Sequence, residues 1–162
     1  MSAPFDSMSM ADAAVTLRSV PRRLAETISG PANDDSWDRI VRQVGPSGHS
    51  ALRSVAVVDA ELVALGTAIA SLPLEKSPVV NLGPVRRTAE PSRTTSVADL
   101  LAQVTEDALR AAVAVEGRGH DDFDRKLTLD GKAITAQDYV RRTIAACLSH
   151  LTDAKEAIEA NT

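Results

Sequence analysis

Apolar residues recur every three or four positions in four long segments of the chain, and this spacing predicts four substantial helices. The expected helices cover residues 11–29, 49–72, 97–116 and 135–160. The second of them is apolar around much of its circumference. A helix of that kind is typically buried among several neighbours.

The connections between these helices differ in length and chemistry. The second and third helices are separated by residues 73–93, which contain Pro73, Pro78, Pro84 and Pro91. Four prolines forbid a long helix there, so we expect an extended crossover. Before the last helix, short alternating runs over residues 126–134 flank an Asp-Gly pair, a strong hairpin signal.

Two further segments complete the expected architecture. A polar loop over residues 32–37 precedes a short helical turn over residues 37–44, with Trp37 fastening the loop to the bundle. Residues 1–10 are small and polar and are expected to be disordered. We therefore predict an all-α four-helix bundle in a single domain over residues 11–162, with a long crossover between helices two and three and a small β-hairpin before helix four.

Composition narrows the classes of function. The chain has 162 residues, 44% of them hydrophobic and 25% charged, which suits one domain with its own core. The net charge is −4 and aromatic residues make up 2%. Both values argue against nucleic-acid binding, which needs clustered cations or stacking rings. We expect a cytoplasmic protein, because no apolar run approaches the ~20 residues of a membrane span and the N-terminus does not resemble a secretory signal.

Three short stretches resemble a known superfamily. They are an acidic loop with a tryptophan over residues 34–39, a helix start over residues 48–53 that leads into residues 58–61, and a last helix carrying residues 139–142 and 150–153. In their order and spacing they are similar to the DinB/YfiT-like four-helix-bundle superfamily. The resemblance is greatest to its mycothiol-dependent maleylpyruvate isomerase branch, and it covers most of residues 11–160.

The resemblance implies a divalent metal between helices two and four, with a low-molecular-weight thiol such as mycothiol or bacillithiol as cofactor. In the family, the metal ligands are one His on helix two and a Glu or His four residues before a second His on helix four. Here His150 matches that second His, but Ala146 stands four residues before it. The helix-two ligand is expected near Ala56 or Val57. Neither side chain can coordinate a metal.

A substitute set of zinc or nickel ligands requires other donors to converge on His150. Cys147 lies three residues earlier on the same helix face, and Asp59 lies across the bundle, so the candidate metal ligands are His150, Cys147 and Asp59. A lone cysteine excludes a multi-cysteine zinc site. Each candidate also has a purely structural interpretation. Cys147 suits a small buried hydrophobe, and a buried Asp59 needs a partner such as His150 or an arginine.

Three hypotheses for function remain open at this point, and whether the chain is an enzyme is undecided. The losses in the ligand set favour a bundle that is degenerate at the metal site, without metal, and binds a small molecule or a protein partner. The second hypothesis is an active metal- and thiol-dependent transferase or isomerase with a rearranged ligand set. The third is a non-enzymatic helical interaction module. Because family bundles pair through their helices, we also expect a homodimer.

Overall fold

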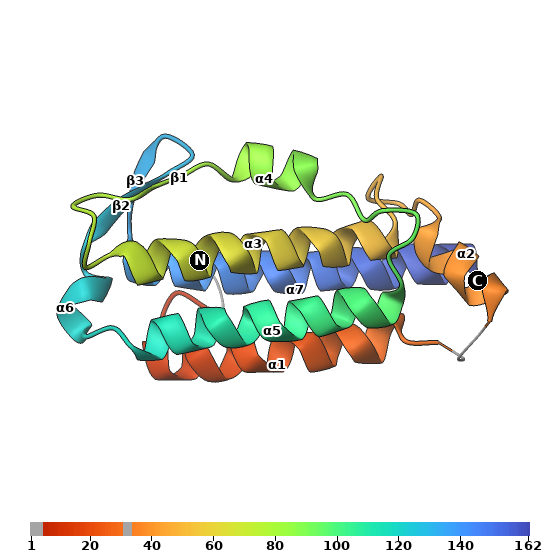
Figure 1. Cartoon of the computed structure of the whole chain (residues 1–162), viewed down its shortest axis with the longest axis horizontal. Coiled ribbons are helices and arrows are strands. Elements are labelled where there is room, and N and C mark those ends of the chain that lie inside the picture. Colours follow the sequence, from red (N-terminus) through yellow and green to blue (C-terminus); the bar gives the residue numbers. More distant parts are fainter. Residues whose placement is uncertain (1–4, 31–33) are drawn as a thin grey trace.

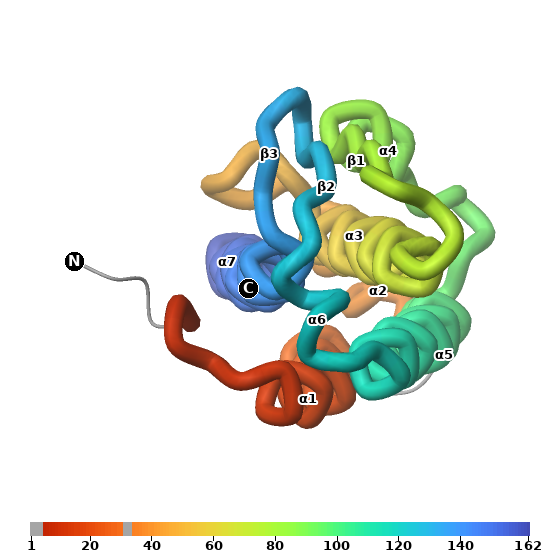
Figure 2. Tube along the Cα trace, turned by 90° about the vertical axis from the view of Figure 1, so that its left-hand side faces the viewer, coloured from red at the N-terminus to blue at the C-terminus, as the bar shows by residue number. Residues whose placement is uncertain are grey.

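Four long helices form the frame of the computed structural model, which describes residues 5–30 and 34–162 (Figure 1). They are α1 (Met10–Ile28), α3 (Ala51–Ser71), α5 (Val97–Glu116) and α7 (Ala136–Asn161). Viewed along the bundle, α3 packs between α5 and α7, and α1 closes the ring by packing against the same two helices (Figure 2). The predicted four-helix bundle is confirmed.

The long crossover gives the bundle its topology. After α3 the chain turns back over the outer side of that helix through β1 (Val79–Val80) and α4 (Leu82–Thr88), and α5 begins at the opposite end of the bundle (Figure 1). The neighbouring helices α3 and α5 therefore run in the same direction. The prolines do prevent a long helix, but Pro84 falls in the first turn of the short helix α4, where a missing N–H is tolerated.

The hairpin is present, and it belongs to a slightly larger sheet than we expected. β2 (Lys126–Leu129) pairs antiparallel with β3 (Lys132–Thr135), with Leu127 opposite Ile134. Asp130 and Gly131 occupy the turn with φ of 50° and 81°, as a tight hairpin requires. β1 adds to β2 in parallel, with Val79 opposite Thr128. A two-residue strand is too short to produce a recognisable sequence pattern.

Two short helices complete the chain. α2 (Asp35–Arg42) begins two residues before the predicted turn, and α6 (His120–Phe123) lies between α5 and the hairpin. The Trp37 indole N–H donates to the carbonyl of Ile28 at 2.9 Å and lies against Gly30, where an added Cβ would be 2.3 Å from the ring. Trp37 thus fastens α2 to the end of α1, as predicted. Residues 31–33 of the polar loop lie outside the described residues.

The start of the chain packs more closely than we expected. Residues 1–4 of the segment predicted to be disordered lie outside the described residues, but Phe5 and Met8 pack against the core. The carbonyl of Met8 accepts a hydrogen bond from Arg141 Nε at 3.0 Å, and Ser9 caps α1. The contact with Arg141 ties residues 5–10 to α7, a tertiary interaction that local composition does not reveal.

Helix α3 is the most apolar element and the centre of the core. It is long and apolar enough to cross a membrane by length and composition, but 61% of its most apolar window is buried inside the bundle, as in the core helix of a helical domain. Two carboxylates, Asp59 and Glu61, are nevertheless buried on this helix, with 6% and 1% exposure. Buried charges need partners, so these two residues direct attention to the site.

Candidate functional site

The buried carboxylate of Glu61 lies at the centre of a small charged cluster. Arg86 donates a hydrogen bond from Nε to Glu61 Oε1 at 2.5 Å. His150 Nε2 lies 3.5 Å from the same oxygen. Glu61 belongs to α3, Arg86 to α4 and His150 to α7, so the cluster joins three elements that are distant in sequence.

The crossover and the hairpin together hold Arg86 above Glu61. The backbone N–H of Leu82, at the start of α4, donates to Asp130 Oδ1 at 2.7 Å, and the Leu82 side chain is buried. Asp130 lies in the hairpin turn, so the turn fixes the first residue of the helix that carries Arg86. On the other side, His150 Nδ1 is 3.7 Å from Asp153 Oδ2, one turn further along α7.

A cavity of about 210 Å³ opens beside this cluster. Its lining consists of Glu61, Leu82, Arg86, Leu129, Asp130, Tyr139, Arg142, Thr143 and Ala146. Two buried polar atoms in this lining, Glu61 Oε2 and the Tyr139 hydroxyl, have no hydrogen-bond partner within the described residues. Because unpartnered buried polar atoms are costly, both atoms are suited to bind a molecule in the cavity.

The charges around the cavity determine which groups are ionised. Burial alone would raise the pKa of Glu61, but hydrogen bonds and charge from His150 and Arg86 outweigh it and hold the pKa below the usual value. Burial, followed by the negative charges of Glu61 and Asp130, raises the pKa of the Tyr139 hydroxyl and outweighs the opposite effects of Arg86 and of the neighbouring Thr143 side chain. At neutral pH the cavity therefore presents a carboxylate acceptor and a neutral hydroxyl.

The three candidate metal ligands do not converge. Asp59 faces α5, where Gln103 Nε2 donates to Asp59 Oδ2 at 2.9 Å. Asp59 is thus two residues, or about 200° of helix, away from the face that Glu61 presents to α7. Cys147 is buried, and burial with the nearby charge of Glu61 raises the pKa of its thiol, which keeps the thiol protonated and a poor ligand.

The carboxylate that faces His150 is Glu61, one turn beyond the expected positions Ala56 and Val57. Ala146, where the resemblance requires a second ligand on helix four, lines the cavity without a donor atom. Among residues 5–30 and 34–162, no group of three or more His, Cys, Asp and Glu side chains is arranged to hold a metal ion. The residues present therefore do not fit the family's metal. The cation that contacts the carboxylate is instead the guanidinium of Arg86.

Sequence reasoning missed two residues of this site. Glu61 stands in the stretch that carried the resemblance, but Asp59 was the carboxylate that we considered as a ligand. The available signal was the angle of about 200° between Asp59 and Glu61 around the helix, because two residues so placed cannot both face α7. Arg86 has no such signal, because its approach to Glu61 depends on the path of the crossover.

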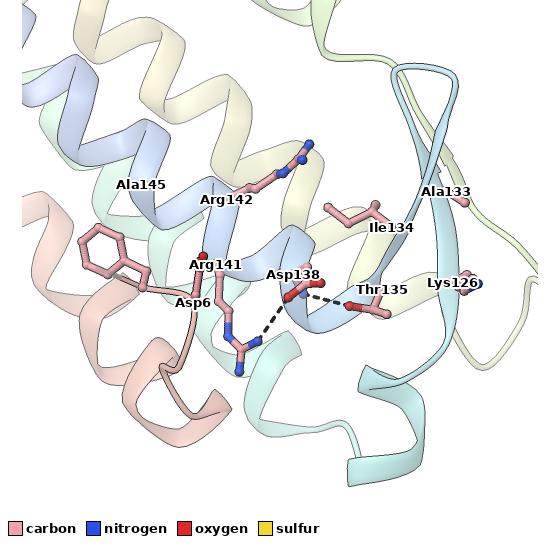
Figure 3. Close-up of a pocket in the computed structure, with 10 residues that line it drawn as sticks. Asp6, Lys126, Ala133, Ile134, Thr135, Asp138, Arg141, Arg142 and Ala145 are labelled. Atoms are coloured by element: carbon pink, nitrogen blue, oxygen red, sulfur yellow. Dashed lines mark hydrogen bonds and ion pairs between the residues drawn. The ribbon is translucent and has the colours of Figure 1, made fainter. Parts of the chain in front are cut away.

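A second cavity of about 550 Å³ lies at the start of α7 and shares one residue with the first (Figure 3). Arg141 and Arg142 leave α7 in different directions: Arg141 turns toward Asp138, 3.1 Å from Nη1 to Oδ1, while Arg142 extends toward the side of the hairpin (Figure 3). Arg142 lines both cavities and makes no ion pair or hydrogen bond with the described residues. Its guanidinium is free to bind an anion at the boundary between them.

Comparisons with known proteins connect this arrangement to one solved structure. No family model matches the chain, and no curated protein sequence matches it. Among solved structures, YfiT from Bacillus subtilis superimposes with a TM-score of 0.78 at 14% sequence identity, covering 96% of this chain and 91% of YfiT. YfiT is described as a probable metal-dependent hydrolase with an unusual four-helix bundle topology. This chain therefore has the YfiT-like four-helix-bundle fold, as the resemblance to the DinB/YfiT-like superfamily implied.

Proposed function

We propose that the protein is a metal-independent bundle of the DinB/YfiT-like fold that binds a small molecule in the cavity beside Glu61. The observation that carries this proposal is the pairing of Glu61 with Arg86 and His150 next to unpartnered polar atoms. An arginine on the carboxylate supplies the positive charge that a metal would otherwise provide. A divalent cation at the same oxygen would face the guanidinium as a like charge.

The size and lining of the cavity support a small ligand. Typical drug-sized sites occupy roughly 300–1,000 Å³, whereas this cavity measures about 210 Å³. Such a space suits a metabolite of roughly six to ten non-hydrogen atoms. Leu82 and Leu129 supply apolar walls, and the polar groups converge from α3, α4, α7 and the turn between β2 and β3.

The rival hypothesis is a metal-dependent enzyme, because YfiT is described as a probable metal-dependent hydrolase. A catalytic zinc site usually keeps three protein ligands. Here His150 and Glu61 are two candidates, and Ala146 lacks a donor atom. Metal binding would require Glu61 to exchange Arg86 for the ion and a third ligand to come from elsewhere.

Elemental analysis of untagged protein purified without chelators tests the proposal. We expect zinc and nickel well below one equivalent per chain, and a melting temperature that chelators do not change, since no ion contributes to the folded state. Close to one equivalent of metal, lost in His150→Ala and retained in the control His120→Ala on α6, would favour the metalloenzyme instead. His120 is exposed and distant in sequence from the cluster, so its replacement controls for adventitious histidine binding.

A further inference from the structure

The cavity contains two unpartnered polar atoms, Glu61 Oε2 and the Tyr139 hydroxyl, and one kind of ligand group suits both. Glu61 Oε2 belongs to an ionised carboxylate and is only able to accept a hydrogen bond. The Tyr139 hydroxyl stays neutral and donates one hydrogen bond while it accepts another. An alcohol group has the chemistry that both atoms require, since it is able to donate to the first and to accept from the second.

An ammonium group fits the same position less well. It would donate to Glu61 but would leave the Tyr139 hydroxyl without an acceptor, because an ammonium has donors only. It would also bring a further positive charge to a carboxylate that already has the Arg86 guanidinium beside it. The inner end of the cavity therefore favours a neutral hydroxyl over an amine.

The outer end of the same cavity favours an anionic group. Arg142 is exposed and makes no ion pair or hydrogen bond with the described residues, and the Arg86 side chain is 46% exposed and uses only Nε on Glu61. Guanidinium groups with free N–H donors bind carboxylates in a bidentate geometry. The polarity of the cavity thus runs from a buried hydroxyl-binding end to a cationic rim.

We infer that the ligand is a small hydroxycarboxylate, whose hydroxyl group binds between Glu61 and Tyr139 and whose carboxylate binds Arg142 at the rim. This inference rests on the proposed function, because it assumes that the cavity is a ligand site without metal. The volume of about 210 Å³ restricts the ligand to a short chain.

Calorimetric titration with four matched molecules tests the ligand class. Lactate carries both groups, propanoate lacks the hydroxyl, propane-1,2-diol lacks the carboxylate, and alanine replaces the hydroxyl with an ammonium. We expect lactate to bind with a dissociation constant of roughly millimolar order, because so few atoms limit the affinity. It should bind at least about tenfold more tightly than the other three, since a site built for a hydroxyl leaves polar groups unpaired when that group is missing.

Two variants assign the ends of the ligand to residues. Tyr139→Phe keeps the ring and removes the hydroxyl, so it should reduce the difference between lactate and propanoate, because Glu61 alone then binds the lactate hydroxyl. Arg142→Gln should abolish the difference between lactate and propane-1,2-diol. Arg87→Gln is the matched control, because Arg87 is an exposed arginine beside Arg86 on α4 that does not line the cavity, and lactate binding should be unchanged.

Each remaining outcome overturns the inference in a recognisable way. Equal binding of propanoate, or tighter binding of alanine, would refute the hydroxycarboxylate class while leaving a metal-free ligand site in place. No binding by any of the four would mean that water satisfies Glu61 and Tyr139. Stoichiometric metal in the elemental analysis would instead remove the proposed function itself, so the two failures are distinguishable.

Discussion

Glu61 is ionised at a position where an isolated charge would be strongly unfavourable. Its side chain is 1% exposed, and its carboxylate depends on Arg86 at 2.5 Å and on His150 at 3.5 Å. Removing one partner of a buried ion pair leaves the remaining charge without compensation. This costs more free energy than the intact pair contributes to stability. The ion pair therefore acts at the scale of single residues, and its loss should be measurable.

Replacing Arg86 with alanine should destabilise the protein by about 1–2 kcal/mol at neutral pH. Hydrogen bonds to charged groups contribute roughly 1.5–3 kcal/mol, and we take the lower part because Arg86 is half exposed and water screens it. The folded-state pKa of Glu61 lies below its ordinary value of 4.5. The stabilisation from this group is therefore present above about pH 4.5 and is lost as the pH falls through the folded pKa.

Urea unfolding of the wild type, Arg86→Ala and the control Arg87→Ala across this pH range measures the effect. The difference between wild type and Arg86→Ala should shrink toward acidic pH, and Arg87→Ala should follow the wild type throughout. Adding Glu61→Gln to Arg86→Ala should recover part of the loss, since no buried charge is then left. An equal loss in both arginine variants would show that Arg86 contributes only general surface charge.

At the scale of elements, the hairpin turn and the crossover depend on each other through one hydrogen bond. Asp130 adopts φ of 50° in the turn and accepts the Leu82 backbone N–H at the start of α4. Aspartate and asparagine tolerate a left-handed backbone better than other non-glycine residues. The turn residue thereby determines where α4, and with it Arg86, lies above α3.

Asp130→Ala should loosen α4 without unfolding the bundle. It removes the acceptor for Leu82 and places a less tolerant residue at positive φ, a loss of about 1–2 kcal/mol. Hydrogen exchange should become faster in residues 82–88 and stay unchanged in α1 and α5. Asp130→Asn keeps both the acceptor and the backbone preference, so its exchange should remain close to that of the wild type. Faster exchange throughout the chain would contradict a local role.

The elements themselves were largely predictable, whereas their contacts were not. Helical periodicity and the Asp-Gly turn are local signals, and both correspond to structure. β1 has two residues and α6 has four, which is too short for a periodic pattern. The pairing of Glu61 with Arg86 arises from the return path of the crossover, a tertiary property without a local signature.

At the scale of the whole molecule, the parallel packing of α3 and α5 buries two acids together. Asp59 on α3 and Asp107 on α5 are 6% and 8% exposed. Gln103 donates to Asp59 at 2.9 Å, while Arg110 Nη1 lies 3.8 Å from Asp107 Oδ1. Burial, followed by the hydrogen bond and charge of Asp107, raises the pKa of Asp59 from 3.8 to about 7. Asp59 therefore remains protonated in the folded bundle under mildly acidic conditions.

This pair makes the stability of the entire bundle depend on pH. Because the folded pKa of Asp59 lies above its unfolded value, its stabilising contribution is complete below about pH 3.8 and is lost as the pH rises through about 7. Each pKa unit corresponds to about 1.4 kcal/mol, so the change over this range amounts to about 4 kcal/mol at most. Glu61 acts in the opposite direction, but at pH values below its ordinary pKa of 4.5.

Asp59→Asn should therefore be more stable than the wild type above pH 7 and should lose the decline between pH 4 and 7. The amide keeps a donor toward Asp107 without acquiring a charge. Glu106→Gln is the matched control, since Glu106 precedes Asp107 on α5, is 63% exposed and pairs with Arg110. Its free energy of unfolding should follow the wild-type pH profile. Parallel profiles for wild type and Asp59→Asn would mean that the two acids do not share a proton between α3 and α5.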